Sequence, residues 1–436
     1  MDKRIRYSII AAGFVFFLAA APLIVLFVRG LKFDFKEKKF IQTGILSLKT
    51  DPLEAEIYLD GKLARTASGD IRFLEAKTYQ ASVRKPGYFD WNKNLLVEPN
   101  KVTWANPENN KIHLFLKNQE PVVALAGVKD FTAWPGGALG LLENEILLFN
   151  SWSLSNPKKI KTKQEFSKIL VFPGAEKFLF YKNIPASENA SLALFDSRSG
   201  KLFDLKALFG SREQLPIFYV TESGRLVALT QASLYAINLE NSTLELLVPK
   251  VESAQIMGEV IYYLAQAKNG YELNSLDLHS GIKQVLASDF PVFKQAEILI
   301  DSRKRIFILA DGSIYTISTQ GLVRESENLN GWDFEQTQNT LIFTASGELR
   351  YFDEQANNRL ITRLSESITL PKIAKSIGYA FFNKKNTLTA LELDQTETQN
   401  SYPIFTGDNI ENYFIDQNAK TLLVLDSGNI KRIRLR

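Results

Sequence analysis

The chain has 436 residues, of which 45% are hydrophobic, so it is long enough to form two or three domains with substantial cores. Its net charge of +4 arises in the first 40 residues, which hold eight Lys and Arg against three Asp and Glu. The remainder is balanced, which leaves no basic domain to bind nucleic acid. Cysteine is absent, and this excludes disulfides, thiolate catalysis and cysteine metal sites.

An apolar run without a single charge extends from Tyr7 to Val28. At about 1.5 Å per residue in a helix, its length matches the roughly 30 Å hydrocarbon core of a bilayer. We therefore expect a single transmembrane helix within residues 1–29. A cleaved signal peptide is the alternative, because alanines occupy positions 19–21, but Pro22 would then follow the cut and the apolar run continues beyond it. A buried core helix is the third interpretation.

The flanking charges bear on the orientation of this helix. Three Lys and Arg precede the run, whereas Arg29, Lys32, Lys36, Lys38 and Lys39 follow it, so the charge rule alone would place the C-terminal side inside. The large mass after the helix favours the opposite arrangement. We predict a cytoplasmic tail, a single pass through the cytoplasmic membrane and an extracytoplasmic bulk.

Residues 30–42 are predicted to be a juxtamembrane linker, and residues 43–118 a small β domain. Apolar side chains alternate with polar ones in three segments, which predicts half-buried strands. The alternating residues are Leu46 and Leu48, then Ala55, Ile57 and Leu59, then Tyr79, Ala81 and Val83. Asp60-Gly61, between two of these segments, is a strong hairpin signal.

At these residues the chain resembles the PEGA domain, a β-sandwich-like module of prokaryotic cell-envelope proteins. The matching segments are residues 50–55, residues 57–62 with Asp60-Gly61, Thr66, Tyr79 and Gly87-Tyr88. The sequence departs from the family pattern at Pro52-Leu53-Glu54-Ala55, at Thr66-Ala67 and at Lys77. The resemblance implies an extracytoplasmic, non-catalytic accessory or binding role and supplies no catalytic residues.

Residues 119–436 contain a repeated unit of short strands. Its anchor, the first apolar residue of the third strand, recurs about every 40 residues, which is typical of a β-propeller. The eight anchors are Ile146, Leu192, Leu234, Leu273, Ile314, Leu349, Leu388 and Ile430. We predict eight blades, with seven as the alternative, and expect the segment from Val122 to Ala126 to pair as the fourth strand of the last blade.

The sequence offers few candidates for a reactive site. Its two histidines, His113 and His279, fall in different predicted domains, which argues against a histidine metal site or a Ser-His-Asp triad. Pairs of carboxylates occur at strand spacing in Glu143/Glu145 and Glu392/Asp394, where we expect a solvated face. We predict no catalytic residue, no cofactor and no metal, and the ligand-binding residues are unknown.

Aromatic residues offer a second set of candidates. Tyr88, Trp91 and Trp104 fit either carbohydrate stacking or core packing, and packing is favoured. Trp134, Trp332 and Phe334 fall near the first strands of their units, where they fit either a channel pocket or inner packing. Packing is favoured there too.

We therefore expect an all-β chain with one N-terminal transmembrane helix, a PEGA-like β-sandwich and an eight-bladed propeller. Its expected function is that of a membrane-anchored, extracytoplasmic interaction protein that binds a protein or a cell-wall glycan. One alternative is a propeller-type hydrolase or lyase acting on envelope polysaccharides. The other is a subunit of an envelope assembly complex.

Overall fold

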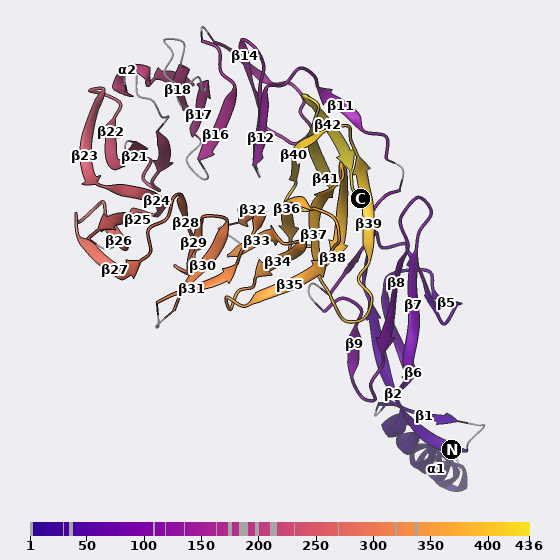
Figure 1. Ribbon diagram of the computed structural model, residues 1–436. Coiled ribbons are helices and arrows are strands. Elements are labelled where there is room, and N and C mark those ends of the chain that lie inside the picture. The colour runs from indigo at the N-terminus through magenta and orange to yellow at the C-terminus, as the bar shows by residue number, and fades with distance from the viewer. Residues whose placement is uncertain are drawn as a thin grey trace.

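The fold was determined as a computed structural model, in which a long helix, a small β domain and a ring of sheets follow one another (Figure 1). The structure describes residues 3–28, 30–34, 38–107, 110–117, 119–134, 136–162, 164–172, 177–182, 191–196, 200–209, 216–230, 232–268, 270–318, 321–335 and 339–436.

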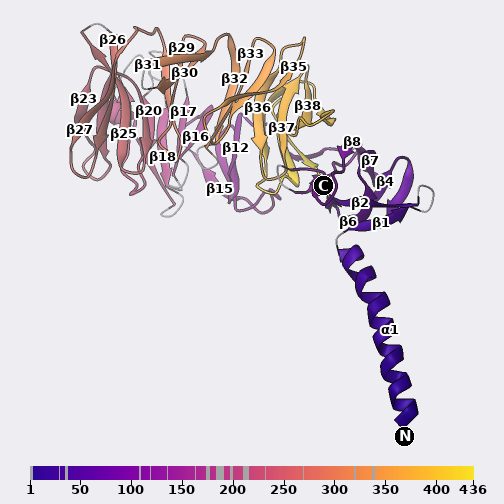
Figure 2. The ribbon, with the colours of Figure 1, turned by 90° about the horizontal axis from the view of Figure 1, so that it is seen from below.

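Helix α1 (Lys3–Val28) projects away from the β domain (Figure 2). A helix that crosses a membrane needs about 20 consecutive, predominantly apolar residues. Within the described ranges, no helix combines the length and the apolarity that a membrane crossing demands. This finding overturns the predicted transmembrane helix from Tyr7 to Val28, and the fold class is corrected to an all-β architecture without that element.

In the described part of the β domain, ten strands form three sheets. The first sheet has β1 (Leu31–Asp34), β2 (Lys39–Leu48) and β6 (Gly69–Glu75) in that order, and β9 (Val102–Trp104) also pairs with β2. The second has β5 (Lys62–Arg65), β4 (Glu56–Leu59), β7 (Thr78–Arg84) and β8 (Trp91–Leu96). The third joins β3 (Thr50–Asp51) to β10 (Ile112–His113) in parallel.

The core of the β domain confirms the alternation in the sequence. All eight residues of the three predicted alternating segments are buried in one apolar cluster. The predicted Asp60-Gly61 turn joins β4 to β5, and both residues have positive φ angles, 49° and 75°. A tight two-residue hairpin needs this conformation, which explains why glycine follows aspartate there.

Each of eight further sheets has four antiparallel strands among the described residues, and we number the sheets along the chain. Sheet 1 has β12 (Asp130–Trp134), β13 (Gly137–Leu141), β14 (Glu145–Phe149) and β15 (Lys158–Lys161). Sheet 2 has β16 (Lys168–Phe172), β17 (Lys177–Lys182), β18 (Ser191–Asp196) and β19 (Lys201–Asp204), followed by the short helix α2 (Lys206–Phe209). Sheet 3 has β20 (Ile217–Val220), β21 (Leu226–Thr230), β22 (Ser233–Asn238) and β23 (Thr243–Pro249). Sheet 4 has β24 (Val251–Met257), β25 (Val260–Ala267), β26 (Gly270–Asp277) and β27 (Lys283–Phe290).

The other four sheets complete the ring. Sheet 5 has β28 (Ala296–Ile300), β29 (Ile306–Ala310), β30 (Ser313–Ser318) and β31 (Gly321–Ser326). Sheet 6 has β32 (Leu329–Glu335), β33 (Thr340–Ala345), β34 (Glu348–Phe352) and β35 (Asn358–Arg363). Sheet 7 has β36 (Thr369–Ala374), β37 (Tyr379–Lys384), β38 (Thr387–Glu392) and β39 (Ser401–Thr406). Sheet 8 has β40 (Ile410–Ile415), β41 (Thr421–Asp426) and β42 (Asn429–Arg434), completed by β11 (Val122–Leu125).

The ring closes because the chain returns to its starting point. Strand β11 pairs with β42, and Val123 lies opposite Lys431, as expected from the sequence. An apolar cluster fills each boundary between consecutive sheets, and one of them joins Leu423 and Ile430 of sheet 8 to Phe131 and Phe149 of sheet 1. Every one of the eight predicted anchors lies on the third strand of its sheet. Burial between sheets is therefore the main force that holds the ring together.

Candidate functional site

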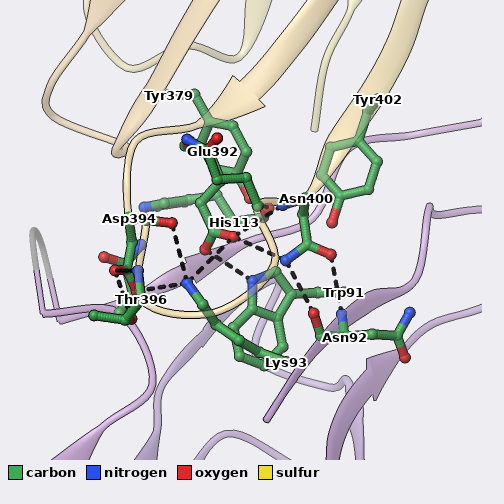
Figure 3. A network of polar contacts seen from close by, with 12 residues as sticks. Trp91, Asn92, Lys93, His113, Tyr379, Glu392, Asp394, Thr396, Asn400 and Tyr402 are labelled. Carbon is green, nitrogen blue, oxygen red and sulfur yellow. Dashed lines mark hydrogen bonds and ion pairs between the residues drawn. The ribbon is translucent and has the colours of Figure 1, made fainter. Parts of the chain in front are cut away.

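A buried polar cluster lies where the β domain meets sheet 7 (Figure 3). Lys93 of β8 points its Nζ at Asp394, 2.6 Å from Oδ2, and at Glu392, 3.6 Å from Oε2. Trp91 donates its indole N–H to Glu392 Oε1 at 3.0 Å. Lys93 and Glu392 are fully buried, and Asp394 is nearly so. A buried lysine therefore has two carboxylates to balance it, both from the other domain.

The amide of Asn400 extends this network. Its Nδ2 donates to Glu392 Oε2 at 2.8 Å and to the Asn92 carbonyl at 3.2 Å, while its Oδ1 accepts from the Asn92 amide at 3.1 Å. Asn400 thus forms a two-way backbone contact with β8. Polar groups removed from water cost free energy unless they are paired, and here each domain supplies the partners of the other.

Aromatic residues seal the neighbouring part of the boundary. Phe115 is fully buried among sheet 7 side chains, 4.9 Å in an edge-to-face contact from Tyr379. Phe89 stacks on Tyr402 with ring centroids 5.3 Å apart. The Tyr402 hydroxyl donates to the Asp90 carbonyl at 3.3 Å. Burial raises the pKa of both Tyr379 and Tyr402 above the ordinary range for tyrosine, so both phenols are neutral donors.

The last residues of sheet 8 also contact the β domain. The Leu116 amide donates to the Leu435 carbonyl at 3.0 Å, and Arg436 pairs with Asp51 at 2.6 Å. Arg436 also contacts the Nδ1 of His113. Burial and the nearby guanidinium lower the pKa of His113 to about 4. We call all these contacts, from Asp51 and residues 89–93 and 113–116 to sheets 7 and 8, the junction. The junction fixes the domains relative to each other.

The structure places the predicted site residues as follows. Glu392 and Asp394 do not line a solvated face, and that prediction is wrong because both face the β domain. Trp91 lies fully buried in the β-domain core and Tyr88 packs against that core, whereas Trp104 is exposed. His279 lies in an exposed turn between β26 and β27. Among the described residues no group of three or more His, Asp or Glu is placed to hold a metal ion.

The aromatic residues near the inner strands pack between sheets. Trp134 packs between sheets 1 and 2, and its ring centroid lies 5.0 Å from that of Phe178. Trp332 and Phe334 pack against the cluster between sheets 5 and 6. These contacts account for the three aromatic residues as inner packing, the interpretation that the sequence favoured.

A groove between sheets 4 and 5 is the candidate binding site. Two cavities, of about 750 and 570 Å³, follow β27 along its length. The larger one touches Ile282, Gln284 and Leu286, and the smaller one touches residues 288–291. The facing wall comes from β30 and β31, with Ile317 at the larger cavity and Arg324 at the smaller. We call this feature the rim groove. Cavities of this size accommodate several side chains of a ligand.

The rim groove lies far from the β domain, since sheets 3 and 4 occupy the side of the ring opposite the junction (Figures 1 and 2). Sequence analysis missed it. The sequence signal for it is the group of apolar residues Ile282, Val285 and Leu286, which the structure places at and just before β27. The sheet that faces this strand is fixed only when the ring closes, so the sequence alone does not identify it.

Comparisons with known proteins agree with this architecture. Residues 43–111 match the PEGA domain, which confirms the resemblance seen in the sequence. A comparison with curated proteins found no match. Among solved structures, the C-terminal WD40 domain of Sif2 is similar, with a TM-score of 0.52, 10% identity, and coverage of 73% of this chain and 98% of that one. A eukaryotic initiation factor structure has a TM-score of 0.50, 8% identity, and coverage of 71% and 86%.

A streptogramin B lyase also matches, with a TM-score of 0.40, 11% identity, and coverage of 73% of this chain and 97% of that one. That likeness is too distant to bear on activity, and identities near 10% show the fold alone. The structures establish a β-propeller fold next to a PEGA domain.

Proposed function

We propose that this chain is an interaction protein of a prokaryotic cell envelope, in which the PEGA domain holds the propeller in one orientation so that the ring binds a partner protein. The observation that carries the proposal is the buried junction. Lys93 and Trp91 of the β domain bond buried carboxylates of the propeller, and Phe115 is buried among sheet 7 side chains. A fixed orientation of this kind suits a protein that presents one surface of its propeller to a partner.

The PEGA domain supports the extracytoplasmic part of this proposal, because the family implies envelope proteins. The charge distribution is compatible with it, since the propeller has no basic excess that would favour nucleic acid. In this assignment the propeller binds through side chains on its exposed surface. The PEGA domain contributes orientation and no chemistry.

The experiment uses the full chain, immobilised and exposed to detergent-solubilised envelope and, separately, to purified cell-wall glycan. We expect a defined protein to be retained and to bind saturably once it is purified. Glycan that is retained and shortened would instead support a polysaccharide hydrolase or lyase and contradict the proposal. A multi-protein complex retained in fixed proportions would assign the chain to an envelope assembly.

Location is tested separately by protease treatment of intact spheroplasts. The proposal expects digestion of residues 43–436 without lysis. Full protection, with digestion only after lysis, would contradict the extracytoplasmic location.

A further inference from the structure

We propose that the rim groove is the partner-binding site, and that it takes an extended peptide segment with acidic ends and alternating apolar side chains. This inference rests on the proposed function and names the site and the partner chemistry. The segment would lie along β27, pair with its free edge and direct alternate side chains into the two cavities.

The outer edge of β27 lacks the charged residues that usually prevent pairing with another chain. Proteins protect the outer strands of their sheets with charged residues, especially lysine, because free N–H and C=O groups otherwise pair with another chain. Strand β15 carries three lysines in four residues, and β35 has an arginine near each end. Between Lys283 and Asp289, β27 has none, and within the described part of the chain it pairs only with β26.

Apolar side chains are exposed at and beside this strand. Ile282, Val285 and Leu286 are all exposed, although they follow one another closely on the outer strand of a folded domain. Val292, just beyond the strand, is exposed as well. Exposed apolar side chains gathered beside a cavity mark an interaction site more often than single exposed ones. An added strand would cover them, which is the usual mode of peptide recognition at a sheet edge.

Two cations of the rim groove would complement acidic residues of a bound segment. Lys304 lines the larger cavity, is exposed, and has no ion-pair partner within the described residues. Arg324 lines the smaller cavity, and its only ion pair among the described residues is an exposed one with Glu327 at 3.3 Å. Exposed pairs of this kind contribute little, so Arg324 is free to exchange its partner. A segment with an acidic residue at each end would satisfy both cations.

The acidic residues of the groove do not oppose this assignment. Asp277 accepts from the amides of His279 and Ser280 at 2.8 and 2.9 Å, which lowers its pKa and commits its carboxylate to its own turn. Asp289 accepts from the Ser288 hydroxyl at 2.8 Å. Arg305, the remaining cation of the larger cavity, is held by Asp301 and by two carbonyls of sheet 6.

The test uses the full chain and a fluorescent probe peptide, Glu-Thr-Val-Thr-Val-Thr-Val-Thr-Glu, in which both glutamates and all valines share one face of the extended chain. A second peptide has lysine in place of both glutamates. Binding is measured by fluorescence anisotropy, and protection of β27 amides by hydrogen exchange. We expect saturable binding of the acidic peptide, at least about tenfold weaker binding of the lysine peptide, and protection that includes β27.

Matched variants locate the site. Leu286→Lys places a charge in the rim groove, and Leu246→Lys places the same charge at a similarly exposed position of β23, outside both cavities. Leu286→Lys should lower the affinity for the acidic peptide about tenfold or more. Leu246→Lys should leave that affinity unchanged. Lys304→Glu should remove the preference for the acidic peptide, because one cation, Arg324, and one carboxylate then face the two peptide ends.

Equal affinities for Leu286→Lys and Leu246→Lys, no saturable binding of the acidic peptide, or protection confined to other strands would overturn the assignment. A concentration-dependent dimer that Leu286→Lys abolishes would overturn it too, because the occupant would then be a second copy. If the purified envelope partner binds Leu286→Lys and Leu246→Lys equally, the rim groove is not the binding site, while the proposed function stands. If the chain retains no protein at all, the proposed function itself fails.

Discussion

The Nζ of Lys93 lies 2.6 Å from Oδ2 of Asp394, with side chains 0% and 4% exposed, although the two residues are separated by 301 positions. A buried ion pair is a weak source of net stability, because removal of two charges from water offsets their attraction. The pair nevertheless constrains the relative position of the two domains, because a misplaced partner leaves a buried charge unpaired. The pair therefore selects one arrangement of the β domain and propeller.

Lys93→Met tests this relationship. The change leaves Glu392 and Asp394 buried without their cation, and breaking one side of such a pair costs about 3 to 5 kcal/mol. We expect the parent chain to unfold in a single transition, and Lys93→Met to split it so that the β domain melts earlier. Calorimetry and urea unfolding measure this. Lys77→Met, which breaks an exposed pair with Asp60 in the same domain, should leave the transition unchanged.

The stability of the chain should depend on pH through His113. Its pKa falls from the usual 6.5 to about 4 in the folded chain, because burial and Arg436 oppose the imidazolium. The unfolded chain therefore binds more protons between these values. Stability is full above about pH 6.5 and decreases by up to about 3 kcal/mol as pH falls toward 4.

His113→Asn should flatten this part of the pH profile, measured by urea unfolding at a series of pH values. His279→Gln, in an exposed turn, is the control and should retain the slope of the parent chain. A slope that persists in His113→Asn would assign the dependence to other groups.

Two neighbouring arginines should differ sharply in their contribution to the ring. Arg305, 17% exposed, bonds Asp301 at 2.5 Å and the sheet 6 carbonyls of Asp353 and Asn339 at 2.6 and 2.8 Å. Arg303, 49% exposed, bonds Glu354. We expect Arg305→Met to lower the free energy of unfolding by about 2 to 3 kcal/mol, and Arg303→Met to change it by less than about 1 kcal/mol. Equal losses would show that burial of the guanidinium is unimportant.

Adjacent glycines in sheet 1 offer a steric test. A Cβ at Gly137 would lie 2.2 Å from the Phe149 carbonyl oxygen, whereas at Gly136 the nearest atom would be 3.5 Å away. Gly137→Ala should therefore cost about 1 to 3 kcal/mol through strand displacement. Gly136→Ala should stay within about 0.5 kcal/mol. Thermal unfolding compares them, and a tolerated Gly137→Ala would contradict the close approach of β13 and β14.

The repeat could be predicted from the sequence because each blade is built locally. Turns such as Asp311-Gly312 and Ser346-Gly347 have positive φ at both residues, and the strands that precede them, β29 and β33, are almost entirely buried. Local rules of this kind place each predicted anchor, such as Ile314, on the third strand. Burial of Trp91 follows the same logic, since a large aromatic in a small domain usually packs.

The junction could not be predicted in the same way. Glu392 and Asp394 have the spacing of residues on a solvated strand face, and only the position of the β domain against sheet 7 makes them buried partners of Lys93. The apolar run from Tyr7 to Val28 shows the reverse error, since hydropathy alone led to a membrane span that the described residues contradict. The rim groove depends on which outer strands face each other.

The central claim is that the β domain and the propeller form one rigid unit. The chain has no cysteine, so spin labels attach only at introduced positions. Lys62→Cys on exposed β5 and Glu245→Cys on β23 place one label on each domain, and pulsed electron paramagnetic resonance gives their distance distribution. We predict one narrow distribution, which broadens when Lys93→Met is added. A broad distribution in the parent chain would contradict the fixed display on which the proposed function depends.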